Sequence, residues 1–171
     1  SVFLDVGAFD ENFPVPSIED IELGSRLLGS GHHILLVKDL QVKHLKRWLL
    51  GDMFATDLLR RASPWTQLML RQGQMVNDLN VKTRDRFSVG LAFVLVITVV
   101  AAWWWPLAWV LAGAVVAALV VLNADLLGFF LRRRGLLFTV GAIPLYWMYL
   151  VTCGLGFGLG LVNHVITRRT T

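Results

Sequence analysis

Two adjacent carboxylic acids, Glu19 and Asp20, follow a loop that contains Pro14 and Pro16. A carboxylate held at the start of a helix can act as a general base and take the proton of an attacking hydroxyl group. The same residues also fit ordinary helix capping, because Ser17 and Asp20 have capping-box spacing and acids favour the first turn of a helix. Residue types and spacing alone therefore leave a catalytic and a capping role open.

Histidine and arginine residues supply the other polar candidates near this pair. His44 ends an alternating pattern that begins at Leu40, so it shares one face of an expected strand and could bind a metal or a diphosphate. A single histidine is more often structural. His32 and His33 are neighbours on an expected strand, point to opposite faces and make a poor metal site. Arg26 is expected to pair with an acid.

The elements that must position these side chains can be read from the same region. A helix is expected from Ser17, with Gly29 and Gly31 as its stop. The segments "HHILLV" and "LQVKH" read as two short strands. This order of loop, helix, strand and strand predicts the end of an α/β domain over residues 1–46.

Composition indicates a membrane protein after this domain. Hydrophobic residues make up 56% of the 171 residues, charged residues 16%, and the mean hydropathy is +0.61. All acids except Asp125 precede residue 87. These values predict a polar segment followed by a membrane segment. The single cysteine, Cys153, offers no disulfide framework and reads as a small buried hydrophobe.

Residues 47–86 combine basic residues with apolar residues, including Trp48 and Trp65, at roughly helical spacing. This pattern predicts basic amphipathic helices at a membrane surface, and packing on a domain core is the alternative. Ser63 and Pro64 are expected to end one helix and start the next.

Two uncharged runs follow. Residues 87–124 are too long for one span of about 20 residues, and Trp103 to Trp109 surround Pro106, so a transmembrane hairpin is predicted. A basic connector occupies 125–136. Residues 137–163 read as a third transmembrane or re-entrant helix around Pro144, and residues 164–171 as a tail. Four glycines at two four-residue spacings would permit close helix packing: Gly154, Gly156, Gly158 and Gly160.

Basic residues fix the expected orientation. They precede the first run and follow the second, at Arg132 to Arg134, whereas the turn between the runs has no charge. The positive-inside rule then places residues 1–86 in the cytoplasm. We expect a multi-pass protein of a cytoplasmic membrane with its polar part inside the cell.

The segments "GAFDENF", "SIEDIELGSRLLGSGHHI" and "VKHLKRW" together resemble the C-terminal part of the catalytic domain of bacterial family 2 glycosyltransferases. The segments "DLLRRASPWTQLML" and "NADLLGFFLRRRGLLF" are similar to the tails of membrane-anchored members. Each motif is weak alone, but their order and spacing extend the resemblance over essentially the whole chain.

This resemblance implies a partial GT-A fold, a Rossmann-like α/β catalytic domain of which only the C-terminal portion is present. It implies an inverting transferase that moves a sugar from a nucleotide-sugar to an acceptor hydroxyl, on a lipid-linked or cell-envelope glycan acceptor. Asp20 would be the general base and Glu19 its supporting acid. The donor, its diphosphate and other substrate groups would contact His44, Arg47, Arg61 and Trp65.

The family also uses a divalent metal, Mg²⁺ or Mn²⁺, held by an Asp–x–Asp motif. Residues 1–37 contain no such motif. The sequence therefore resembles a fragment that lacks the nucleotide-binding half and is expected to be inactive alone, with His44 as a possible additional metal ligand.

A non-enzymatic polytopic scaffold or transporter subunit is the alternative. Ionisable groups occur only at the ends of the apolar runs, so no intramembrane relay is visible. Nucleic acid is not an expected partner, because the basic residues are interleaved with apolar ones. The expected partners are the nucleotide-sugar, the acceptor and membrane lipids.

Overall fold

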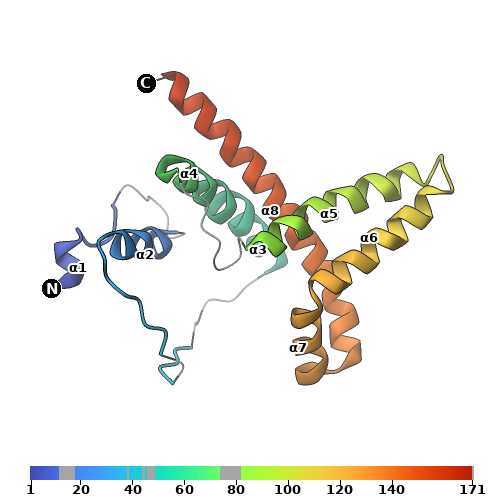
Figure 1. The fold of residues 1–171 in the computed structure, drawn as a ribbon, viewed down its shortest axis with the longest axis horizontal. Helices are drawn as coiled ribbons and strands as arrows, with labels where there is room; N and C mark the ends of the chain where they lie inside the picture. Colours follow the sequence, from blue (N-terminus) through green and yellow to red (C-terminus); the bar gives the residue numbers. More distant parts are fainter. Residues whose placement is uncertain (12–17, 38, 44, 46–48, 74–81, 171) are drawn as a thin grey trace.

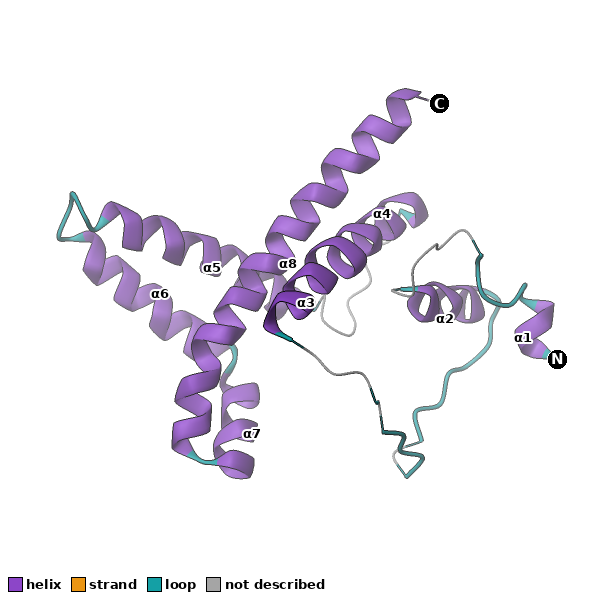
Figure 2. Cartoon of the chain, turned by 180° about the vertical axis from the view of Figure 1, so that it is seen from behind, coloured by secondary structure: helices purple, strands orange, loops and turns teal. Residues whose placement is uncertain are grey.

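The computed structural model describes residues 1–11, 18–37, 39–43, 45, 49–73 and 82–170. All regular secondary structure in this part of the chain is helical, and a single long helix near the C-terminus crosses the other helices (Figure 1; Figure 2). The predicted partial GT-A, Rossmann-like α/β domain is therefore wrong for the described residues, which form an all-α structure.

The error lies in the two predicted strands. Residues 32–37 and 39–43 are irregular, and their apolar side chains face solvent, with Leu36 86% and Val42 93% exposed. A strand is stabilised only when a neighbouring strand accepts and donates its backbone hydrogen bonds. No described segment supplies such a partner, so the apolar alternation alone does not produce a sheet.

The polar N-terminal region contains two helices, α1 (Val2–Asp5) and α2 (Glu19–Gly29). The predicted helix is confirmed as α2, and its end at Gly29 is followed by Gly31 at φ +81°, a backbone conformation that glycine adopts without strain. Ile18 occupies the N-cap position without a side-chain cap hydrogen bond. The capping role predicted for Ser17 falls outside the described residues.

A continuous helical rod follows, made of α3 (Leu50–Ala55), the π-helical segment η1 (Thr56–Ala62) and α4 (Ser63–Gln72). A new element, α4, starts at Ser63 with Pro64 in its first turn, as predicted, but the predicted break between the helices is absent, because Ala62 and Ser63 keep right-handed helical dihedrals. The hydrogen-bonding pattern changes from π to α at this point, which accommodates a proline that has no N–H to donate.

Two antiparallel helices, α5 (Thr83–Ala101) and α6 (Ala108–Leu122), form a hairpin whose turn carries three exposed tryptophans, Trp103 to Trp105. Small and branched residues hold the helices together, and Leu150 of the last helix joins them. The buried set is Ala92, Leu95, Ala112, Val115, Leu119 and Leu150.

The remaining helices are α7 (Ala124–Arg134) and α8 (Leu136–Thr170). The region predicted as a basic connector is therefore mostly helical. α8 has 35 residues and continues as a helix through Pro144. Among the described residues, Leu136–Thr167 is the one helix that is long and apolar enough by itself to cross a membrane. Helices α6 and α7 meet this criterion only together, across a bend of 71°.

Helix α8 connects the rod to the hairpin. Gly156 and Gly160 face the rod so closely that an added Cβ would lie 2.4 Å from the Ala62 Cβ and 2.6 Å from the Thr66 Cβ. Gly154 faces Phe93 of α5 in the same way. The expectation of close packing is thus confirmed at these three glycines, whereas an added Cβ at Gly158 would meet no atom within 4 Å.

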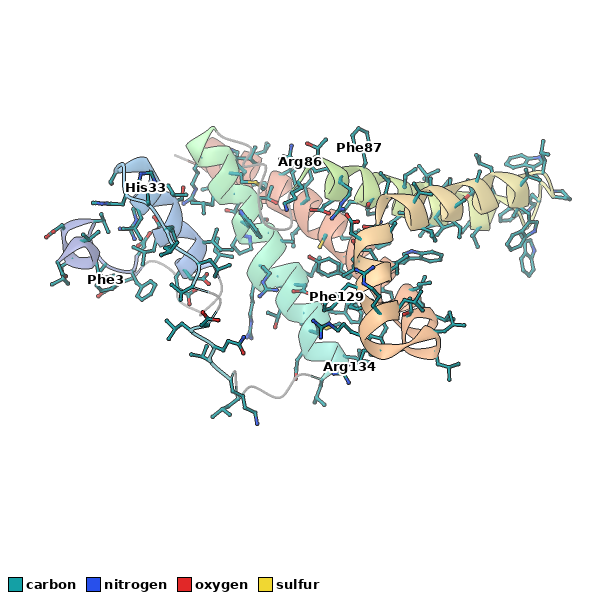
Figure 3. All side chains as sticks on the ribbon, turned by 60° about the horizontal axis from the view of Figure 1, so that its bottom comes forward. Phe3, His33, Arg86, Phe87, Phe129 and Arg134 are labelled. Carbon is teal, nitrogen blue, oxygen red and sulfur yellow. The ribbon has the colours of Figure 1, made fainter. Side chains whose placement is uncertain are left out.

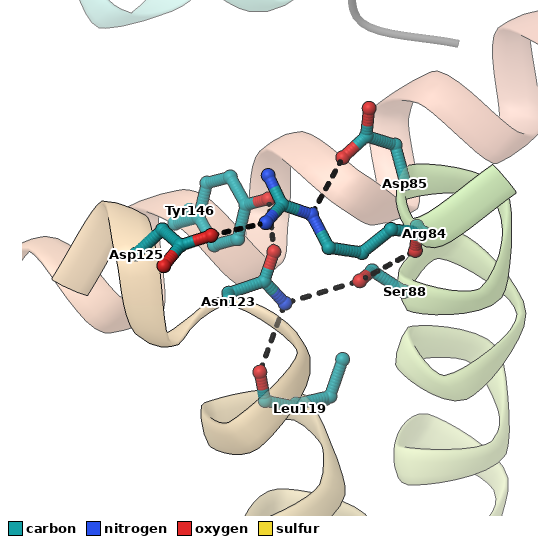
Figure 4. Close-up of polar contacts among 7 residues, drawn as sticks. All are labelled: Arg84, Asp85, Ser88, Leu119, Asn123, Asp125 and Tyr146. Atoms are coloured by element: carbon teal, nitrogen blue, oxygen red, sulfur yellow. Dashed lines mark hydrogen bonds and ion pairs between the residues drawn. The ribbon is translucent and has the colours of Figure 1, made fainter. Parts of the chain in front are cut away.

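A buried polar junction joins α5, α8 and the connection between α6 and α7 (Figure 4). The Asn123 amide donates to the Ser88 hydroxyl at 3.0 Å, and the Tyr146 hydroxyl donates to the Asn123 side-chain oxygen at 2.8 Å. Beside it, Arg84 pairs with Asp125 at 2.9 Å. These contacts place the starts of α5 and α7 at the same end of the hairpin.

Candidate functional site

Arg26 joins helix α2 to the loop that contains the segment "GAFDENF". Its guanidinium pairs with both carboxylate oxygens of Glu22, at 2.6 and 2.8 Å. It also donates to the backbone carbonyl of Ala8 at 2.6 Å and to that of Val6. The hydrogen bond to Glu22 raises the pKa of Arg26 above its ordinary value. The prediction that Arg26 pairs with an acid is confirmed, and the pair fixes the loop on the helix.

The loop and the helix enclose a small hollow. Gly7 lies at φ +89°, and an added Cβ there would meet the Arg26 guanidinium at 3.4 Å. A glycine at this position therefore avoids backbone strain and lets the arginine approach the loop. The hollow is lined by Gly7, Ala8, Phe9, Asp10, Glu11, Glu22 and Arg26. Two motifs that are separated in the sequence thus form one unit.

The carboxylate pair lies at the amino-terminal end of α2. Asp20 is exposed, and its Oδ1 accepts a hydrogen bond of 2.8 Å from the Ile21 amide. Glu19 is half-buried. The preceding residue, Ile18, is completely buried and clusters with Trp65 of α4. This contact turns the carboxylate end of α2 toward the rod, as Figure 1 also shows.

Two of the predicted substrate residues lie on the rod, one turn apart. Arg61 pairs with Asp57 at 3.2 Å, and Trp65 is 9% exposed between Ile18 and a cavity of about 350 Å³. Arg61 also lines this cavity. The structure therefore brings the carboxylate end of α2 next to Trp65, and Arg61 lines the same cavity as that tryptophan. The other two predicted substrate residues, His44 and Arg47, lie outside the described residues.

Asp57 was not predicted as part of the site. It is buried, with 9% of its side chain exposed, and burial raises the pKa of its carboxyl group although Arg61 opposes this shift. The only signal in the sequence is the four-residue spacing of an acid and an arginine on one helix. That pattern is ordinary on exposed helices, so the burial of Asp57 follows from the packing of the rod on α8.

The divalent metal implied by the resemblance has no site in the described part of the chain. No three histidine, cysteine, aspartate or glutamate side chains approach one another there in a way that could hold a metal ion. His32 and His33 belong to no such group. We therefore assign no metal-dependent step to these residues.

Comparisons with protein-family models, with curated proteins and with solved structures found no match. The contacts described above are consequently the basis for assigning a function.

Proposed function

We propose that this chain belongs to an inverting glycosyltransferase that transfers a sugar from a nucleotide-sugar to an acceptor hydroxyl at the cytoplasmic face of a bacterial inner membrane. The observation that carries the proposal is the position of Glu19 and Asp20. They begin a helix that Arg26 joins to the first motif loop, and Ile18 holds that helix against the rod. The acids are thereby placed beside the rod, which packs on the apolar helix α8.

The reaction requires a base at this point. The Asp20 carboxylate would accept the proton of the acceptor hydroxyl while its oxygen attacks the anomeric carbon. The bond from that carbon to the nucleoside diphosphate breaks on the opposite face, so the configuration inverts. Asp20 is exposed and thus accessible to a substrate, and Glu19 beside it would orient the acceptor.

The membrane arrangement is part of the proposal. Helix α8 has the length and composition of a membrane span. This arrangement would keep residues 1–86 in the cytoplasm, where nucleotide-sugars are supplied.

The proposal predicts that Asp20→Asn abolishes transfer. Loss of a general base typically lowers the rate by about 10²–10⁴-fold. The assay uses membranes of cells that express the whole reading frame, with a panel of radiolabelled nucleotide-sugars, and follows label incorporated into lipid and glycan fractions. Binding of the nucleotide-sugar should stay nearly unchanged.

Asp52→Asn is the matched control, because Asp52 is an exposed acid in the first turn of α3. It should retain wild-type transfer. If Asp20→Asn keeps more than about a tenth of the wild-type rate, Asp20 is not the base.

A further inference from the structure

The cavity beside Trp65 is enclosed by the rod, by the start of α5 and by the middle of α8. Its volume of about 350 Å³ is within the roughly 300–1,000 Å³ of small-molecule sites. Most of its wall is apolar, from Trp65, Met69, Val89 and Phe157. Charged side chains border it as well: Asp57 and Arg61 from the rod, and Asp85 and Arg86 from α5. Figure 3 shows Arg86 at the start of α5.

One polar atom in this cavity lacks a partner among the described residues. The Asp57 Oδ1 accepts a hydrogen bond from Arg61 at 3.2 Å, but no described residue donates to the second oxygen, Oδ2. The side chain is 91% buried and lines the cavity. Leaving a buried carboxylate oxygen without a donor costs free energy, so a ligand that donates a hydrogen bond would be favoured here.

The position of the cavity limits what that ligand can be. Two of the lining helices, α5 and α8, belong to the apolar part of the chain, and Gly90, which is exposed on α5, also lines the cavity. In the proposed membrane arrangement, lipid molecules would lie beside these helices. The wall suits a hydrocarbon chain, and the charged border suits a polar head group.

We propose that this cavity binds a membrane lipid with a hydroxyl-bearing head group, whose hydrocarbon chain lies along Trp65 and Phe157 and whose hydroxyl donates to Asp57. This inference goes beyond the proposed transferase function and does not require it. A lipid can bind here whether or not Asp20 is a catalytic base. The two proposals therefore fail independently.

The test is native mass spectrometry of the purified chain in detergent with two probe lipids. Dioleoylphosphatidylglycerol carries free hydroxyls, and dioleoylphosphatidylmethanol has the same chains and charge without them. We expect the wild type to bind the glycerol lipid about five-fold or more tightly, because hydrogen bonds to a charged acceptor are roughly twice as strong as neutral ones. Asp57→Asn should remove most of this preference. Equal binding of the two lipids by the wild type would overturn the role of Asp57.

A graded substitution tests the cavity itself. An added Cβ at Gly90 meets no atom within 4 Å, so Gly90→Ala adds a methyl group without a clash, and Gly90→Leu adds a larger side chain at the same lining position. Binding of the glycerol lipid should fall slightly with alanine and at least ten-fold with leucine. Gly141→Leu on α8 is the control, because this exposed glycine also has open space and does not border the cavity. If Gly90→Leu binds like Gly141→Leu while both remain helical by circular dichroism, the lipid does not occupy this cavity.

Discussion

At the scale of single residues, Arg26 links helix α2 to the loop that precedes it. Its planar guanidinium satisfies Glu22 and two carbonyl oxygens of the loop at once. Lysine carries the same charge but concentrates it in one ammonium group that cannot reproduce this fork. The loop with the segment "GAFDENF" is therefore held by the planar shape of the guanidinium group as well as by its charge.

Arg26→Lys should therefore loosen the loop without unfolding the rod. Losing two or three hydrogen bonds of about 0.5–1.5 kcal/mol each is expected to speed proteolytic cleavage within residues 6–11 by about ten-fold or more. Limited proteolysis followed by mass spectrometry measures this rate. Arg71→Lys, an exposed arginine in the last turn of α4, should cleave like the wild type. Equal cleavage of the loop in both variants would mean that Arg26 does not hold it.

The candidate site could be predicted only in part at this scale. The sequence correctly indicated that Arg26 pairs with an acid. Trp65 was predicted only through the family resemblance, and its contact with Ile18 joins residues 47 positions apart, which no local pattern encodes. Asp57 was missed for the same reason. Its burial depends on how the rod meets α8, and an acid at helical spacing from an arginine is usually exposed.

At the scale of elements, the contact between the rod and α8 depends on two glycines. A Cβ added at Gly160 would lie 2.7 Å from the carbonyl oxygen of Ser63, which is backbone and cannot rotate away. Gly156→Ala and Gly160→Ala should each destabilise the protein by about 1–3 kcal/mol through overpacking. The measurement is thermal unfolding in detergent.

Gly158→Ala provides the control for these two substitutions. It lies between them on the same helix but faces open space. Alanine there should leave stability unchanged or raise it by up to about 1 kcal/mol, because alanine favours helix more than glycine does. If all three variants melt at the same temperature, the rod does not pack on α8 as described.

Helices were predictable where the pattern is local. The stop of α2 at Gly29 and the turn near Pro106 follow from residues within a few positions of each other. Strands were not predictable in this way. The apolar patterns at 32–37 and 39–43 indicate strands only if another strand lies beside them, and a local pattern does not show whether one does. The helix break predicted at Pro64 is a second case that a local pattern did not resolve. The π-helical segment before Pro64 lets the helical rod continue without a break.

At the scale of the whole molecule, the proposed membrane arrangement predicts which surfaces face each side. Ser30 is exposed after α2. In a Cys153→Ser background, a cysteine at Ser30 should react with an impermeant thiol reagent only after the cells are lysed. Reaction at Ser30 in intact cells would place the carboxylate pair outside the cell and remove its supply of nucleotide-sugar.

The length of α8 has a consequence for the bilayer around it. The uncharged stretch 135–163 is about 43 Å long at about 1.5 Å per residue, whereas the hydrocarbon core is about 30 Å thick. Such hydrophobic mismatch is relieved by tilting the helix or by thickening the bilayer locally. The rod packs on α8 at Gly156 and Gly160, and α2 packs on the rod through Ile18. A change in lipid chain length would therefore tilt α8 and shift the height of the carboxylate pair above the head groups.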